Sequence, residues 1–199
     1  MSQQELFASS SRLPEGFIYQ PEFLAQEEET RLLSVIKDLP LKEAQYKEYT
    51  AKRRTVSYGF KYDFSRNALD AAPAIPPFLT ALREKVAHWV EIPPDKFVHG
   101  LVSEYRPGAP LGWHRDVPEF EAIVGMSLGG SCRMRLRPYR PGGRNRREDV
   151  IALELAPRSA YVMRSVARWG WQHSITQTKE LRYSITLRTA NAKQDARFA

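Results

Sequence analysis

The hydrophobic period of the chain changes near Lys96, and this change restricts the folds available to it. Before that point two segments have helical spacing: residues 27–39, with acids in the first turn and Pro40 after the last, and residues 76–90, followed by Pro93 and Pro94. Beyond it, short apolar runs alternate with turn residues, so we expect strands at 97–105, 122–128, 132–137, 150–155, 159–163 and 181–189. This order favours an α+β fold, a jelly roll buttressed by N-terminal helices.

The length of 199 residues favours a single domain, which we place at 13–190, with polar tails at 1–12 and 191–199. No apolar run approaches the ~20 residues that a bilayer span needs, so we expect no membrane partner. The N-terminus lacks the pattern of a secretory signal, and the single cysteine, Cys132, cannot form an internal disulfide. We therefore expect an intracellular monomer in the cytoplasm, with the nucleus as an alternative in a eukaryote.

Positive charge is concentrated in two stretches of a chain whose net charge is +7 and whose pI is about 9.6. Between Ser131 and Arg147 there is no acid, and seven arginines stand at 133, 135, 137, 140, 144, 146 and 147. Between residues 44 and 61 the basic residues are Lys47, Lys52, Arg53, Arg54 and Lys61, with Glu48 the only acid. Basic patches of this kind attract polyanions such as nucleic acid, although a solvated basic surface is an equally good interpretation of charge alone.

Three residues could bind one metal ion. His114 and Asp116 are two apart, so in an extended segment their side chains project on the same side. Three or four strands later, His173 can return to the same end of a barrel and add a second imidazole. Two histidines and one carboxylate on one face of an octahedron form the usual site of non-haem Fe(II) oxygenases. We expect His88 to lie on the helix surface and His99 to be a hydrogen-bonded core residue, so neither joins the site.

The segment from Arg182 to Arg188 alternates without a break. Arg182, Ser184, Thr186 and Arg188 share one face of a strand, and the residues between them share the other. An ordinary half-buried strand with its polar face in water would have this pattern. The same face could instead form the polar wall of a pocket for a dicarboxylate, because the planar guanidinium group binds a carboxylate bidentately.

Together these motifs resemble the AlkB family of nucleic-acid dealkylases. The resemblance rests on His114-x-Asp116, then His173, then Arg182-x-Ser184-x-Thr186-x-Arg188, where the family usually has RxNxTxR. Supporting matches extend from about residue 13 to 190. They are the N-terminal Leu13-Pro-Glu-Gly-Phe17, the hairpin Tyr58-Gly-Phe-Lys-Tyr62, the turn Tyr105-Arg-Pro-Gly-Ala109 and the strand Ser127-Leu-Gly129.

The resemblance implies a double-stranded β-helix that uses Fe(II), 2-oxoglutarate and O2. Fe(II) would be held by His114, Asp116 and His173. The far carboxylate of 2-oxoglutarate would pair with Arg182 and Tyr105, with Arg188 close by and Ser103, Ser184 and Thr186 on the same wall. The implied reaction hydroxylates an N-methyl carbon of a base in DNA or RNA and releases formaldehyde, succinate and CO2.

The chain departs from the family pattern mainly where the substrate would bind. Ser184 and Ser103 stand where the family often has Asn, and Val117-Pro118 replaces the acid that repair members place beside the damaged base. Candidate substrate contacts are Tyr58 and Tyr62 for stacking on a base, and Arg53, Arg54, Arg133 and Arg135 for phosphates. Two alternatives stay open: a dioxygenase of the same fold acting on protein, lipid or small molecules, and a basic binding module with a dead site.

Overall fold

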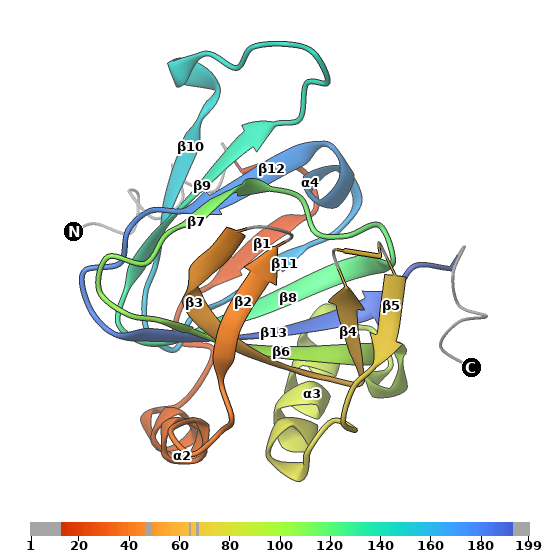
Figure 1. The fold of residues 1–199 in the computed structure, drawn as a ribbon, viewed down its shortest axis with the longest axis vertical. Coiled ribbons are helices and arrows are strands. Elements are labelled where there is room, and N and C mark those ends of the chain that lie inside the picture. Colours follow the sequence, from red (N-terminus) through yellow and green to blue (C-terminus); the bar gives the residue numbers. More distant parts are fainter. Residues whose placement is uncertain (1–12, 47–48, 64, 67, 193–199) are drawn as a thin grey trace.

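A computed structural model describes residues 13–46, 49–63, 65–66 and 68–192 (Figure 1). The tail expected at 1–12 lies outside the described residues, as does 193–199 of the second tail. Asn191, which we assigned to that second tail, is tied to the fold, because its backbone N–H donates to the Glu119 carbonyl oxygen at 2.8 Å. Among the described residues, none of the helices combines the length and the apolar character that a bilayer crossing requires.

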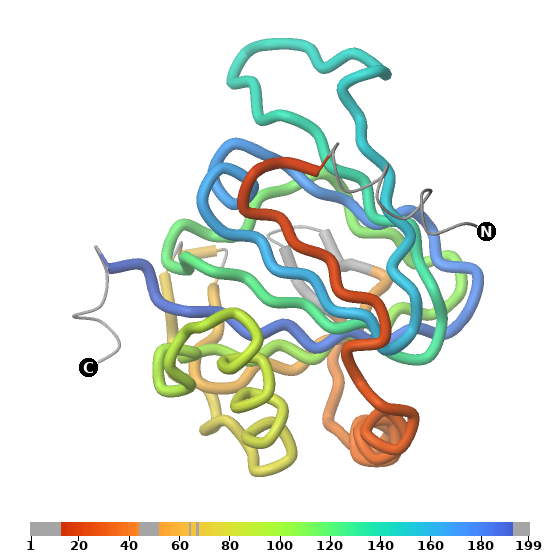
Figure 2. Tube along the Cα trace, turned by 180° about the vertical axis from the view of Figure 1, so that it is seen from behind, coloured from red at the N-terminus to blue at the C-terminus, as the bar shows by residue number. Residues whose placement is uncertain are grey.

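Seven strands form the large sheet, in the order β1-β11-β8-β13-β6-β3-β2. Their bounds are β1 (Phe17–Gln20), β11 (Ala160–Met163), β8 (Phe120–Gly129), β13 (Arg182–Ala190), β6 (Phe97–Tyr105), β3 (Tyr49–Tyr58) and β2 (Lys42–Tyr46). All neighbouring pairs are antiparallel. Seen from behind, the N-terminal segment runs along β11 and then passes to the first helix (Figure 2).

A smaller sheet of four strands, in the order β10-β9-β12-β7, faces the large one. Its strands are β10 (Ile151–Leu155), β9 (Cys132–Pro138), β12 (Trp171–Ile175) and β7 (Leu111–His114). The β9–β10 hairpin, which includes the 3-10 turn Arg147–Asp149, extends beyond the body of the sheets (Figure 1). A separate two-stranded ribbon, β4 (Phe60–Asp63) and β5 (Ala68–Ala71), lies beside the large sheet.

Two helices cover the outer face of the large sheet, and a short one lies next to the small sheet. They are α2 (Gln26–Ile36), α3 (Pro77–Val90), which the 3-10 turn Pro94–Lys96 follows, and α4 (Ser165–Trp169). The apolar stripes of α2 and α3 pack on the outward residues of β6, β8 and β13, and this layer contains Tyr183, Ile185 and Leu187. A second apolar cluster fills the space between the sheets near β9 and β10. Elsewhere on the inner face of the large sheet, β13 and much of β6 present polar residues.

This architecture confirms the predicted jelly roll with N-terminal helices. Both predicted helices and all six predicted strands are present, and β6 has the predicted bounds. The sequence did not indicate β1, β2, β5, β7 or β12 as strands, and it marked β3 and β4 only where they meet, at Tyr58–Tyr62. His88 is exposed on α3, as expected.

Candidate metal centre and its pocket

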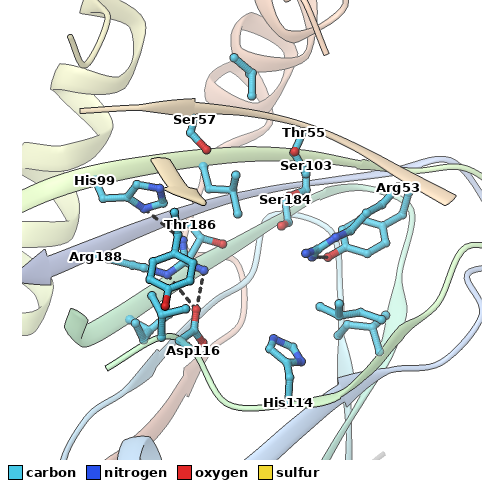
Figure 3. A pocket seen from close by; sticks show the side chains of 18 of the residues that line it. Arg53, Thr55, Ser57, His99, Ser103, His114, Asp116, Ser184, Thr186 and Arg188 are labelled. Carbon is cyan, nitrogen blue, oxygen red and sulfur yellow. Dashed lines mark hydrogen bonds and ion pairs between the residues drawn. The ribbon is translucent and has the colours of Figure 1, made fainter. Parts of the chain in front are cut away.

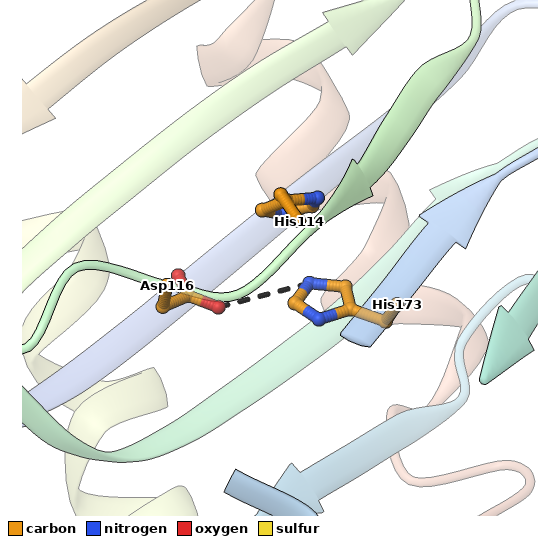
Figure 4. Close-up of side chains that lie close together, drawn as sticks. All are labelled: His114, Asp116 and His173. Carbon is orange, nitrogen blue, oxygen red and sulfur yellow. Dashed lines mark ion pairs between the residues drawn. The ribbon is translucent and has the colours of Figure 1, made fainter. Parts of the chain in front are cut away.

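His114 and His173 face each other across the pair of strands β7 and β12, in direct register. This pairing brings together two histidines that are 59 residues apart, because directly opposed residues of an antiparallel pair are neighbours in space. Asp116 follows two residues after His114 and joins them. The candidate donor atoms of the three side chains all lie within 4.8 Å of one another (Figure 4).

One hydrogen bond orients His114, and a close contact joins the other two side chains. Nδ1 of His114 lies 2.9 Å from the Gly112 carbonyl oxygen, which can only accept, so this nitrogen donates and Nε2 keeps its lone pair. The Nε2 atom of His173 lies 3.7 Å from Oδ2 of Asp116. One nitrogen of each histidine and one carboxylate oxygen are therefore available within a small space.

Burial and a nearby cation hold the three groups in the protonation states that metal binding requires. Burial lowers the pKa of His173 to about 3, and the neighbouring His114 adds to the shift. Burial also lowers the pKa of His114, so both imidazoles are neutral at pH 7. Burial by itself raises the pKa of Asp116, but the Arg188 guanidinium and the other groups around the carboxylate together outweigh this effect, and the pKa lies well below 3.8.

This donor set fits a divalent iron ion. Two neutral imidazoles and one carboxylate match the preferences of Fe(II) and leave coordination positions open. Separations of at most 4.8 Å mean that a small closure of the side chains gives metal–ligand distances of about 2.0–2.2 Å. The three predicted ligands are thus brought together by the fold.

A cavity of about 1510 Å³ lies between the two sheets and includes the three ligands in its wall. The polar face of β13 forms one side of it, as the alternation predicted, and β6 continues that side, since Ser184 lies opposite Ser103 and Arg182 opposite Tyr105 (Figure 3). All the residues that we predicted for this wall line the cavity: Ser103, Tyr105, Arg182, Ser184, Thr186 and Arg188.

Arg182 is a buried cation with an incomplete set of partners. Arg182 is only 2% exposed. Its Nε donates to Ser127 Oγ at 2.9 Å, and its guanidinium carbon lies 5.0 Å from the centre of the Tyr105 ring. Nη1 is buried and has no hydrogen-bond partner among the described residues. A buried donor without a partner is costly, so an anionic ligand in the cavity would fit this position.

Comparison with known proteins identifies the family. The sequence model of the 2OG-Fe(II) oxygenase superfamily matches residues 16–188, which include all three candidate metal ligands and the polar face of β13. The chain belongs to this superfamily. It is an AlkB-family 2-oxoglutarate-dependent dioxygenase, and the cofactors of such an enzyme are Fe(II), 2-oxoglutarate and O2.

Several relatives of the oxygenase have names that point to nucleic acid. A Xenopus tropicalis protein named tRNA (carboxymethyluridine(34)-5-O)-methyltransferase alkbh8 is 30% identical over 85% of this chain and 26% of its own length. The Alkylated DNA repair protein ALKBH8 homolog of Arabidopsis thaliana is 27% identical over 87% of this chain and 54% of its own length. The DNA oxidative demethylase ALKBH2 of Bos taurus is 29% identical over 71% of this chain and 54% of its own length.

The oxygenase thus spans about a quarter to about half the length of these curated relatives. A solved structure, that of OsALKBH1, matches with a TM-score of 0.70 at 14% identity, covering 89% of this chain and 98% of the other. At that identity the likeness concerns the fold alone, and it agrees with the jelly roll described above.

Arg188, which the resemblance placed close to the co-substrate, lines the cavity and also contacts a metal-ligand side chain. Its Nε and Nη2 both donate to Oδ1 of Asp116, at 2.9 and 2.6 Å. A third contact of 3.2 Å joins its Nη1 to Nδ1 of His99, which is a buried core residue as predicted. Arg188 therefore holds one oxygen of the metal-ligand carboxylate and leaves Oδ2 facing His173.

The loop that follows Asp116 is fixed by Arg168, a residue that sequence reasoning missed. Arg168 lies on α4, is 2% exposed, and donates through Nη2 to the carbonyl oxygens of Asp116, Val117 and Phe120, at 3.2, 2.7 and 2.8 Å. Such a bond pattern defines the path of the backbone that carries the carboxylate. The only signal in the sequence was an arginine beside Trp169, which does not reveal a target 52 residues away.

Strand alternation corrects the interpretation of Arg53, Arg54 and Tyr58 on β3. Arg54 points to the helix-covered face and forms a bidentate ion pair with Glu104, at 2.8 and 2.7 Å, so it is not free for phosphates. Tyr58 is 7% exposed and packs edge-on against Phe78 in the core, which leaves it no face for a nucleobase. Arg53 points the other way, into the cavity, where Nη1 lies 3.3 Å from the Tyr105 hydroxyl oxygen.

Of the remaining residues predicted to contact the substrate, two line the cavity and one lies on the surface. Tyr62 on β4 and Arg135 on β9 line the cavity. Arg133 does not line it; its side chain is exposed and lies 3.8 Å from Glu154.

Tyr161 is a second residue that the sequence did not reveal, and it lines the cavity. A Cβ on Gly125 would lie 2.4 Å from its ring, so only glycine at this position of β8 leaves room for the partly buried Tyr161 ring. Burial, with the Asp116 carboxylate, raises the pKa of Tyr161, and the phenol stays protonated.

Proposed function

We propose that the oxygenase removes N-alkyl groups from bases in DNA or RNA by hydroxylating the alkyl carbon. For an N-methyl group the hydroxylated carbon leaves as formaldehyde, while 2-oxoglutarate becomes succinate and CO2. The observation that carries this proposal is one cavity that contains both the His114, Asp116 and His173 cluster and the buried, incompletely bonded guanidinium of Arg182. The names of relatives, a DNA demethylase and two ALKBH8 proteins, support a nucleic-acid substrate.

Different residues of the cavity would bind the metal ion and the co-substrate. Bound Fe(II), with 2-oxoglutarate and O2, would supply the oxidising power for a C–H bond. His114 and His173 would hold the metal as neutral ligands, and Asp116 would hold it through the oxygen that Arg188 does not occupy. Arg182 would bind the far carboxylate of 2-oxoglutarate bidentately, and the Tyr105 hydroxyl, which accepts a bond from Arg53, can donate to the same carboxylate.

A base must leave its stack to reach the metal centre, and the cavity offers the space for it. Its volume of about 1510 Å³ exceeds what a small dicarboxylate fills. Tyr62 of β4 and Thr55 and Ser57 of β3 line the cavity as well. Tyr62 stays our candidate for stacking on the extruded base.

The direct test is the coupling of succinate and formaldehyde release to methylated oligonucleotides. With Fe(II) and 2-oxoglutarate, single-stranded DNA or RNA carrying N-methylated bases should stimulate both products in equal amounts, and the unmodified strand should not. Asp116→Ala should abolish both products while the circular dichroism spectrum is retained. Product release that no methylated oligonucleotide stimulates would contradict the proposal.

One observation favours a second candidate, a dioxygenase of the same fold with a protein, lipid or small-molecule substrate. The residue after Asp116 that lines the cavity is Val117, and Arg168 fixes its backbone there, so no carboxylate next to Asp116 faces a cationic methylated base from that loop. The two candidates separate in the same assay, because only the second permits succinate release that is indifferent to nucleic acid.

A further inference from the structure

The outer face of the small sheet has a row of arginines whose guanidinium groups lie over aromatic rings. Arg135 and Arg137 stand two apart on β9, and Met134 and Leu136 between and beside them are buried in the core. Trp113 belongs to β7, two strands away, with only Ser174 and Gln172 of β12 between them in register. Both guanidinium groups reach over β12 to the Trp113 ring, with their carbons 4.9 and 4.2 Å from its centre.

Each of these two arginines is anchored through one nitrogen. Nε of Arg135 donates to Ser174 Oγ at 3.0 Å, and Nε of Arg137 donates to Gln172 Oε1 at 2.9 Å. The terminal Nη groups take part in no hydrogen bond within the described part of the chain. A guanidinium that is fixed by stacking and by Nε presents its remaining donors without a further loss of side-chain entropy on binding.

Arg115 extends the row along β7 and the loop after it. Its guanidinium carbon lies 3.5 Å from the Tyr139 ring centre, and its Nη1 donates to the Trp169 carbonyl oxygen at 3.0 Å. We call Arg115, Arg135 and Arg137, with Trp113 and Tyr139, the stacked arginine face. None of its three arginines has a carboxylate within 4.0 Å among residues 13–46, 49–63, 65–66 and 68–192.

Other arginines of the same basic stretch differ on this point. Arg140 forms an ion pair with Asp149 at 2.7 Å, Arg146 with Glu148 at 3.2 Å, and Arg133 is 3.8 Å from Glu154. The positive charge of the hairpin is therefore partly neutralised, whereas the charge on the stacked arginine face is not. A row of preorganised guanidinium groups without acidic partners is better explained as a binding site for an anion with several phosphates than as an ordinary solvated basic surface.

The face also adjoins the metal centre. On β7, His114 points to the candidate metal site, and its neighbours Trp113 and Arg115 belong to the face. Trp113, Arg115 and Arg135 line the rim of the cavity as well. A strand whose base occupies the cavity would have its flanking backbone at this rim.

We infer that the stacked arginine face binds the phosphodiester backbone of a single-stranded nucleic acid, on the nucleotides that flank the base in the cavity. This inference rests on the proposed function. Residues two apart on a strand are separated by about 6.6 Å, so Arg135 and Arg137 can meet two neighbouring phosphates of an extended strand. A single strand is favoured over a duplex because its backbone can bend from the face into the cavity.

Binding of an unmodified strand tests the face independently of catalysis. Fluorescence anisotropy would measure the affinity of a labelled single strand of about 16 nucleotides for the full chain and two double variants. Arg135→Gln with Arg137→Gln should weaken binding at least about tenfold and reduce the slope of log K against log salt by about 1.4. The control, Arg140→Gln with Arg146→Gln, removes the same charge from paired arginines and should change affinity less than about twofold.

A lysine pair separates stacking from charge. Arg135→Lys with Arg137→Lys keeps both charges, so the salt slope should stay near that of the wild type while affinity falls several-fold. Equal losses in the glutamine pair and the control pair would overturn the inference, because the effect would then be one of net charge. Competition by poly-glutamate as strong as that by the oligonucleotide would also overturn it, in favour of an acidic protein partner.

Turnover distinguishes failure of the face from failure of the proposed function. A methylated long strand should be a better substrate than a methylated trinucleotide, and the glutamine pair should reduce this advantage about tenfold. An unchanged advantage would overturn the face. If no methylated strand of any length is demethylated while unmodified strands still bind through Arg135 and Arg137, the proposed function fails and the surface stands.

Discussion

At the scale of single residues, Arg182 and Arg188 share one face of β13 but have opposite electrostatic surroundings. Arg188 has a buried carboxylate, Asp116, at 2.6 Å, so the two charges compensate each other. Arg182 has a serine hydroxyl and the Tyr105 ring, and its Nη1 is left without a partner among the described residues. Arg188 therefore compensates the charge of a metal-ligand carboxylate. Arg182 instead has a buried donor that an anionic ligand could satisfy.

The first prediction concerns Arg182 and the co-substrate. Arg182→Lys keeps the charge but loses the planar fork, so the concentration of 2-oxoglutarate for half-maximal turnover should rise at least about tenfold. Co(II) affinity, measured by calorimetry without 2-oxoglutarate, should stay the same because no metal ligand changes. Arg158→Lys, at an exposed ion pair with Glu22, serves as the control. If the Arg182→Lys enzyme needs no more 2-oxoglutarate than the wild type, another residue must bind the far carboxylate of the co-substrate.

The second prediction compares the stability of two methionine variants of the iron-free protein. Arg188→Met removes one partner of a buried ion pair and should lower the free energy of unfolding by about 3–5 kcal/mol. Arg182→Met removes a buried cation with no carboxylate partner, so it should cost clearly less, although a bond to Ser127 is lost. Urea denaturation of both variants measures the difference. Equal destabilisation would show that Arg182 is neutralised within the chain.

At the scale of elements, the position of Asp116 depends on the contact between its loop and α4. Arg168 donates to three carbonyl oxygens of this loop, Arg115 donates back to the Trp169 carbonyl, and Trp169 Nε1 donates to Glu121 at 2.9 Å. The loop is thus tied to α4 in both directions. A side chain that does not line the cavity thereby determines where the carboxylate ligand lies.

The third prediction tests this tie. Arg168→Lys keeps a buried charge, but the lysine side chain is shorter and does not place its ammonium at the position from which Nη2 donates to all three carbonyl oxygens, so Co(II) affinity should fall at least about tenfold. Amide hydrogen exchange should accelerate at 117–121 more than in β8 beyond it. Arg164→Lys is the matched control, because Arg164 precedes α4 and bonds to the distant Val90 carbonyl oxygen. If Arg168→Lys binds Co(II) as tightly as the wild type, Arg168 stabilises the fold but does not position Asp116 for the metal.

The same scale explains which elements the sequence could predict. The alternation on β13 and the apolar stripes of α2 and α3 are local patterns, and they predicted the elements and the polar wall. The two strands that carry the histidines, β7 and β12, are four and five residues long and are strands only because they pair with each other and with β9. The adjacent Arg53 and Arg54 likewise face opposite ways, which the sequence pattern of β3 did not reveal.

At the scale of the whole molecule, the two faces of the large sheet have different chemistry. Helices α2 and α3 cover the outer face with an apolar layer, and the inner face holds a cavity with buried charges and neutral histidines. The cost of burying the ionisable groups of the inner face must be met by the apolar packing of the rest of the fold. The fold therefore has a pH dependence that follows from the cavity.

The last prediction gives the sign of that dependence for the iron-free protein. Burial, and for His99 also the Arg188 guanidinium, keeps the pKa of His99 well below 6.5, and the pKa of His173 is about 3. In the unfolded chain both histidines bind protons near pH 6.5, so below that pH the unfolded state binds more protons than the folded one. The stability they contribute is fully present above about pH 6.5 and is lost as the pH falls towards the folded pKa values, by about 1.4 kcal/mol per pH unit for each histidine. Urea denaturation between about pH 6.5 and 5.5, above the range in which most carboxylates titrate, measures this slope. His99→Gln should reduce the slope by the contribution of one histidine, about 1.4 kcal/mol per pH unit. His88→Gln, on the exposed face of α3, is the control and should leave the slope unchanged. A stability that stays constant over this range would mean that His99 and His173 accept protons in the folded protein, which is incompatible with a metal site held by a neutral His173.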